Sequence, residues 1–182
     1  ELGGNNAAII CPTADLDLTV KGITFSACGT TGQRCTTLRR AFVHEDVYAE
    51  FMDKLHAYYS TLKIGDPSDK SSQLGPLISE LSFNNMQRVL DSLRKKDVNI
   101  YGGQRLETGD PKEFYVMPAI VEVSEIEDEM LNETFAPGTT SPCVRSATWL
   151  KPWERCGRVR LPVVLGVLGV ARPCHAPQAQ RV

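Results

Sequence analysis

The first 137 residues of the sequence predict an α/β domain, with a mostly parallel sheet and flanking helices. Apolar runs of strand length alternate with longer segments in which apolar residues recur every three or four positions. Parallel strands need such crossover helices, which then bury both faces of the sheet. The chain has 182 residues, of which 42% are hydrophobic, so it is long enough for one domain with a sizeable core. No apolar run reaches the roughly 18 residues of a transmembrane helix, so no membrane association is expected.

The first elements follow from short patterns. Residues 7–10 form the first predicted strand, and the turn at 12–15 offers Thr13 or Asp15 as a helix cap. The segment 29–32 contains two glycines and predicts the end of the helix that follows this cap. Residues 41–43 predict a second buried strand. The apolar face of the first helix consists of Leu16, Val20, Ile23 and Ala27.

Two amphipathic helices and further strands complete this part. One helix presents apolar residues on one side from Val47 to Leu62, and a polar loop occupies 65–75. A third helix has its apolar face between Phe83 and Leu93, and it ends in a basic run, which the helix dipole favours. Residues 98–101, 115–117 and 120–121 predict strands.

The composition changes after Pro137. Residues 1–137 carry 13 basic and 21 acidic residues, a formal charge of −8, whereas residues 138–182 carry 7 basic residues and one acidic, a charge of +6. This second part holds both tryptophans and 5 of the 11 prolines, which work against regular structure. We therefore expect residues 138–182 to be a separate, poorly ordered basic tail. Its charges are scattered singly, so nucleic-acid binding is not expected.

The cysteines point to nucleophilic chemistry rather than to metal binding. The six cysteines contain no Cys-x2-Cys pair, and the three histidines lie far from matched ligands, so no metal site is expected. Cys35 follows Arg34 and two nearby glycines, and a neighbouring cation stabilises the reactive thiolate. Cys35 is therefore a candidate nucleophile, and its alternative role is that of a small core residue. Glu1 is a candidate base for water activation, or else a solvated charge.

Three motifs in order resemble the aldehyde dehydrogenase superfamily. They are Glu-Leu-Gly-Gly at residues 1–4, Gly-Gln-x-Cys at 32–35 and Glu-x-Phe-x-Pro at 133–137. The resemblance covers residues 1–137 and implies part of that family's catalytic domain. It implies that Cys35 is the nucleophile, that Glu1 is the general base, that Glu133 hydrogen-bonds the nicotinamide ribose and that Phe135 packs near the nicotinamide ring. The implied reaction is NAD(P)-dependent oxidation of an aldehyde to a carboxylic acid through a thiohemiacetal and a thioester.

Finer features are similar to the antiquitin branch of that family. These are the two asparagines after Gly4, the Arg-Cys-Thr-Thr sequence from Arg34 and the alanine at 136 where glycine is usual. The branch oxidises α-aminoadipic semialdehyde in lysine catabolism. The resemblance implies that Arg34 pairs with a substrate carboxylate, and the alternative for this guanidinium is a structural ion pair. NAD is the expected cofactor, and NADP is not excluded.

The sequence also departs from the family. The dinucleotide-binding domain precedes the Glu-Leu-Gly-Gly motif in the family, and no family pattern continues after Pro137. We therefore expect a fragment that does not assemble as its homo-oligomeric relatives do. The alternative function is a truncated, catalytically inactive remnant. The expected compartment is the cytoplasm, with the mitochondrion as the alternative.

Overall fold

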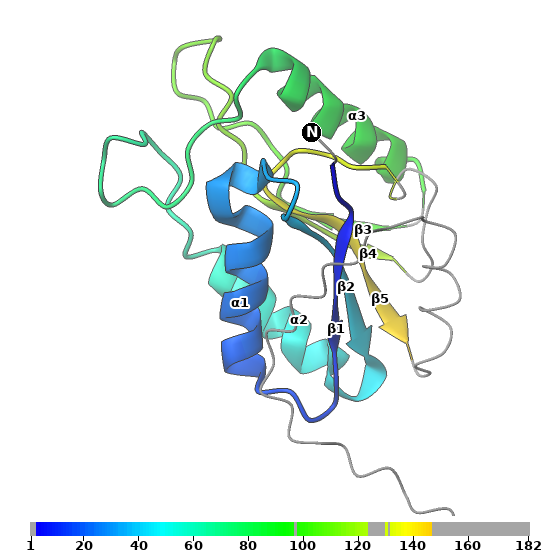
Figure 1. Cartoon of the computed structure of the whole chain (residues 1–182). Helices are drawn as coiled ribbons and strands as arrows, with labels where there is room; N and C mark the ends of the chain where they lie inside the picture. The colour runs from blue at the N-terminus through cyan, green and yellow to red at the C-terminus, as the bar shows by residue number, and fades with distance from the viewer. Residues whose placement is uncertain (1–2, 97, 124–129, 131, 147–182) are drawn as a thin grey trace, which may run out of the picture.

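The structure is a computed structural model that describes residues 3–96, 98–123, 130 and 132–146 (Figure 1). Its elements follow the predicted alternation of strands and helices. In chain order they are β1 (Asn6–Ile10), α1 (Leu16–Cys28), the 3-10 turn η1 (Gly29–Gly32), β2 (Leu38–His44), α2 (Glu45–Tyr59), α3 (Glu80–Arg94), β3 (Asn99–Tyr101), β4 (Ala119–Val123) and β5 (Gly138–Ser146).

The five strands form one sheet in the order β1-β2-β5-β4-β3. The first four strands of this order are parallel, and only β3, at one edge, runs antiparallel to β4. The parallel strands therefore all begin at the same edge of the sheet. Consequently, the segments that precede β1, β2 and β5 meet at that edge.

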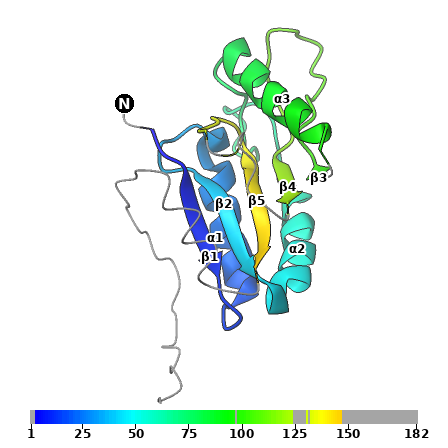
Figure 2. The ribbon, with the colours of Figure 1, turned by 90° about the vertical axis from the view of Figure 1, so that its right-hand side faces the viewer.

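Helices cover both faces of the sheet, as the sequence predicts (Figure 2). On one face, α1 and α2 pack together against a core that includes Ile10, Val43 and Ile120. On the other face, α3 packs against Val121 and Val123. Alternate residues of β4 thus enter opposite cores, because successive side chains of a strand point to opposite faces.

Local capping explains where the helices begin. The Asp15 side chain accepts a hydrogen bond from the backbone N–H of Leu18 at the start of α1, so Asp15 is the cap of the two predicted candidates. Ser79 caps α3 by accepting from Ser82 N–H in the same way. Such caps satisfy N–H groups that have no partner inside the helix.

The structure differs from the sequence prediction at two places. Residues 115–117 are not a strand; Val116 forms only an isolated bridge with Arg105. Residues 138–146, the first part of the predicted tail, form β5 in the middle of the sheet. Strand pairing therefore continues beyond Pro137. The prediction for residues 147–182 falls outside the described residues.

Candidate active site

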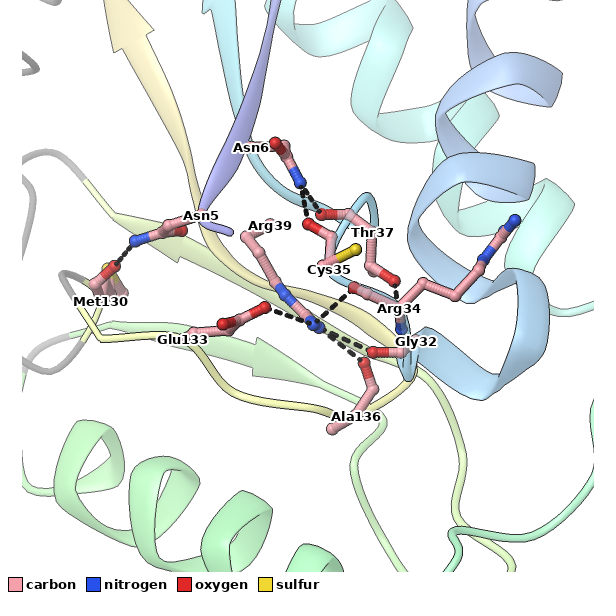
Figure 3. A network of polar contacts seen from close by, with 10 residues as sticks. All are labelled: Asn5, Asn6, Gly32, Arg34, Cys35, Thr37, Arg39, Met130, Glu133 and Ala136. Carbon is pink, nitrogen blue, oxygen red and sulfur yellow. Dashed lines mark hydrogen bonds and ion pairs between the residues drawn. The ribbon is translucent and has the colours of Figure 1, made fainter. Parts of the chain in front are cut away.

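The site lies where the amino ends of β1, β2 and β5 meet (Figure 3). Each of the three sequence motifs directly precedes one of these adjacent strands. Gly3 and Gly4 lead into β1, Cys35 lies before β2, and Glu133 lies before β5. The sheet order therefore brings together motifs that are about 100 residues apart in the chain.

Cys35 occupies the corner of a tight turn and is exposed. The Thr37 N–H donates to Arg34 O at 3.0 Å, and the Thr37 hydroxyl accepts from Arg34 N–H at 3.1 Å. The turn is also held from β1, because Asn6 Nδ2 donates to Cys35 O at 2.7 Å and to Thr37 O at 3.0 Å. Cys35 is thus a solvent-accessible thiol on a backbone fixed from both sides.

A strained segment precedes this turn. Thr30 and Thr31 adopt φ values of 55° and 53°, and Gly32 has a φ of 65°. The left-handed region is costly for β-branched residues, and such strain is concentrated at functional sites. The three residues break the helical path after α1 and direct the chain toward Cys35.

The glycines of the first motif lie against the other two motifs. A Cβ atom at Gly3 would lie 2.5 Å from Glu133 Oε2, and one at Gly4 would overlap with Cys35 O. Only residues without side chains allow the backbone to approach so closely. Glu1, the predicted base, lies outside the described residues.

Arg39 connects the nucleophile turn to the segment that carries Glu133. Its guanidinium donates to Gly32 O at 2.9 Å, to Arg34 O at 3.4 Å and to Ala136 O at 3.5 Å. Its Nη2 lies 3.7 Å from Glu133 Oε1, in an ion pair. Burial lowers the pKa of Arg39 to about 10, against the opposing effect of the Glu133 carboxylate. The side chain therefore stays charged at neutral pH.

Arg34 and Glu133 lie on opposite sides of Cys35 (Figure 3). The Arg34 guanidinium extends toward α1 and stacks 5.8 Å from the centre of the Phe25 ring. Among the described residues, no carboxylate forms an ion pair with Arg34, and its Nε has no hydrogen-bond partner there. The structural ion pair considered above is therefore absent from the described part of the chain.

Glu133 and Phe135 line an open cavity of about 410 Å³ between their segment and α3. The Glu133 side chain is 18% exposed, and within the described structure its buried Oε1 accepts no hydrogen bond. A carboxylate oxygen in this state suits a hydroxyl donor from a ligand. Helix α3 contributes the remaining wall, from Ser82, Asn85, Arg88, Val89 and Ser92.

Cys11, Cys28, His44 and His56 show no comparable site. Cys28 is buried, and burial raises the pKa of its thiol to about 11, whereas Cys11 is half-buried. His44 and His56 are also half-buried. Within the described residues, no three His, Cys, Asp or Glu side chains gather closely enough to hold a metal ion, and no helix has the length and apolar character of a membrane span.

A sequence model of the aldehyde dehydrogenase family matches residues 1–141. The chain belongs to the aldehyde dehydrogenase family. Aldehyde dehydrogenase family 7 member A1 of Pisum sativum is 40% identical over 138 residues, which are 75% of this chain and 27% of that protein. Alpha-aminoadipic semialdehyde dehydrogenase of Mus musculus is 40% identical over 139 residues, which are 75% of this chain and 25% of that protein. The predicted resemblance to the family and its antiquitin branch is confirmed.

Solved structures of the family have the same fold. The NAD⁺ complex of an aldehyde dehydrogenase from Bacillus cereus superimposes with a TM-score of 0.77 at 25% identity. The match covers 87% of this chain and 32% of the Bacillus cereus chain. The predicted α/β catalytic-domain fold is thus confirmed. The chain spans about a quarter of the length of the two curated relatives named above.

Sequence reasoning does not assign roles to Asn6 and Arg39. One sequence feature could have pointed to Arg39. It is one of two adjacent arginines at the start of a strand that is buried on both faces, and buried guanidinium groups need partners. For Asn6, the signal is a polar side chain at the beginning of a strand. Neither pattern identifies the partners, which lie in the segments that precede β2 and β5.

Proposed function

We propose that this chain carries the catalytic cysteine of an NAD(P)-dependent enzyme that oxidises an aldehyde to a carboxylic acid. The observation that carries the proposal is the meeting of the three family motifs at one sheet edge, around an exposed Cys35. The family relationship supports the same chemistry.

In this proposal, the Cys35 thiolate attacks the aldehyde carbon. An S–C bond forms as the C=O π bond opens, and the resulting oxygen anion needs nearby donors. Within the described structure, the backbone N–H of Cys35 donates to no other residue, so it is available for this oxygen. After oxidation, Glu1 activates the water molecule that hydrolyses the thioester and releases the acid.

The residues of the cavity fit a nicotinamide nucleotide. Such a cofactor, when bound, supplies the acceptor for the hydride that leaves the aldehyde carbon. Glu133 offers a ribose hydroxyl its carboxylate, whose Oε1 accepts no hydrogen bond in the described structure, and Phe135 offers an aromatic ring at the same cavity. Both NAD and NADP contain this ribose, so these residues do not select between them.

We propose α-aminoadipic semialdehyde as the substrate. A relative that is 40% identical bears this aldehyde in its name. Arg34 supports the choice, because it directly precedes the nucleophile and its guanidinium, which extends toward α1, has no carboxylate partner in the described chain. A guanidinium binds a carboxylate through two parallel hydrogen bonds. The carboxylate of the semialdehyde would therefore approach from the α1 side of Cys35.

Formation of NADH from NAD⁺ and α-aminoadipic semialdehyde, followed by absorbance, tests the proposal. NADH formation that is lost in Cys35→Ser supports it. Absence of NADH formation in both proteins would refute the proposal for this 182-residue chain.

A further inference from the structure

Two adjacent arginines at the start of β2 are both buried. Arg39 is 2% exposed and Arg40 is 1% exposed. Desolvation of a guanidinium is costly unless its charge and its donors find partners. The partners of each side chain therefore indicate what its guanidinium does in the fold.

Arg39 has partners in both halves of the site, whereas the contacts of Arg40 lie elsewhere. Two of the carbonyl acceptors of Arg39 belong to the nucleophile segment, namely Gly32 O and Arg34 O. Arg40 Nη2 instead donates to Asn5 O, and its Nε and Nη1 have no hydrogen-bond partner among the described residues. Only one of the two arginines thus connects the nucleophile to another motif.

Arg39 also contacts the segment that precedes β5. It donates to Ala136 O, and its guanidinium carbon lies 5.2 Å from the centre of the Phe135 ring, in a cation–π contact. The ion pair with Glu133 at 3.7 Å is longer than a hydrogen bond. Glu133 Oε1 is therefore held by charge attraction, while its capacity to accept a hydrogen bond is not used.

We propose that Arg39 is a positioning residue that fixes the Glu133 carboxylate relative to the Cys35 turn. The planar guanidinium has enough donors to bind both segments at once, and a lysine ammonium does not reproduce this fork. The assignment of Glu133 to a cofactor rests on the function proposed above. The link between the Cys35 turn and the Glu133 segment does not depend on it.

Alkylation of Cys11, Cys28 and Cys35 in the full chain by iodoacetamide, mapped by peptide mass spectrometry, tests the link. In Arg39→Lys we expect the Cys35 rate to change about threefold or more, because Arg39 binds the Gly32 and Arg34 carbonyls that precede Cys35, while the rate of buried Cys28 stays constant. Arg40→Lys is the matched control and should leave the Cys35 rate near that of the wild type. An unchanged Cys35 rate in Arg39→Lys, or equal changes in both variants, overturns the proposal. Faster labelling of Cys28 in a variant indicates that its fold opens as a whole. The Cys35 rates of the two variants are then compared at a lower temperature, where both are folded.

Binding of nicotinamide mononucleotide, followed by ligand-detected NMR, tests whether Arg39 acts through Glu133. We expect Arg39→Lys and Glu133→Gln each to weaken binding, and the double variant to bind no more weakly than Glu133→Gln alone. If the losses of binding affinity in the two single variants add up in the double variant, Arg39 does not act through Glu133, and this part of the proposal is overturned. If the wild type does not bind this probe, the cofactor role of Glu133 fails, and the alkylation rates alone decide the role of Arg39.

Discussion

Replacement of Gly32 by alanine tests the close contact between two of the motifs. Gly32 has a φ of 65°, and a Cβ atom there would overlap with Ala136 O and lie 2.8 Å from Pro137 N. Left-handed backbone costs a non-glycine residue about 1–2 kcal/mol. The overlap is with backbone, so the segment before β5 must also move away from Arg39. That movement weakens the hydrogen bond that the charged Arg39 donates to Ala136 O, worth about 1.5–3 kcal/mol. The expected loss of unfolding free energy is about 2.5–5 kcal/mol.

Two other glycines separate the two causes. Gly109 has a φ of 91°, but a Cβ atom there would meet nothing within 4 Å, so Gly109→Ala carries strain without overlap and should cost about 1–2 kcal/mol. Gly22 lies inside α1 with nothing within 4 Å, so Gly22→Ala should stabilise the chain by about 0.5–1 kcal/mol.

Urea unfolding followed by far-UV circular dichroism measures the three effects. The predicted order of stability is Gly22→Ala, wild type, Gly109→Ala and then Gly32→Ala. If Gly32→Ala loses no more than Gly109→Ala, the segments of Cys35 and Glu133 are not in contact, and the described site geometry is refuted.

Three further substitutions test separate features. Burial raises the pKa of the Cys28 thiol from 9.0 to about 11, so stability that is present below about pH 9 is lost as the pH rises through about 11. The loss is roughly 3 kcal/mol, and Cys28→Ala should remove that part of the pH dependence of urea unfolding. Asn6→Ala removes two hydrogen bonds from the nucleophile turn and should cost about 1–2 kcal/mol and alter the Cys35 alkylation rate; an unchanged rate would show that Asn6 does not hold the turn. Thr30→Gly relieves left-handed strain at an exposed residue and should stabilise the chain by about 1 kcal/mol in thermal unfolding, and a loss would contradict the strain.

The helices and most strands could be predicted because each depends on a local pattern. The faces of α1 and α3 carry apolar residues at helical spacing, and Asp15 lies at the expected cap. Residues 115–117 resemble a strand because they are apolar and of strand length. Tyr115 and Val116 are buried, and Val116 packs in the core with α3, but the segment forms only an isolated bridge with Arg105. Strand pairing is a non-local property, and a short apolar run does not reveal it.

The candidate site was only partly predictable for a similar reason. The residues around Cys35 form recognisable motifs, but the motifs come together only because β5 pairs in the middle of the sheet. Strand β5 lies in residues 138–182, whose composition predicts a poorly ordered tail, so this pairing was not predicted. The role of Arg39 depends on carbonyl groups before two different strands. Carbonyl groups occur at every residue, so the sequence contains no mark of such partners.

The nucleophilic addition of Cys35 to an aldehyde is the central claim, and it can be measured without a cofactor. The full chain is mixed with α-aminoadipic semialdehyde that carries ¹³C at the aldehyde carbon, and the ¹³C NMR spectrum is recorded. We predict a thiohemiacetal resonance that disappears in Cys35→Ser and remains in Cys11→Ser. A resonance that survives in Cys35→Ser, or that depends on Cys11, would contradict the claim.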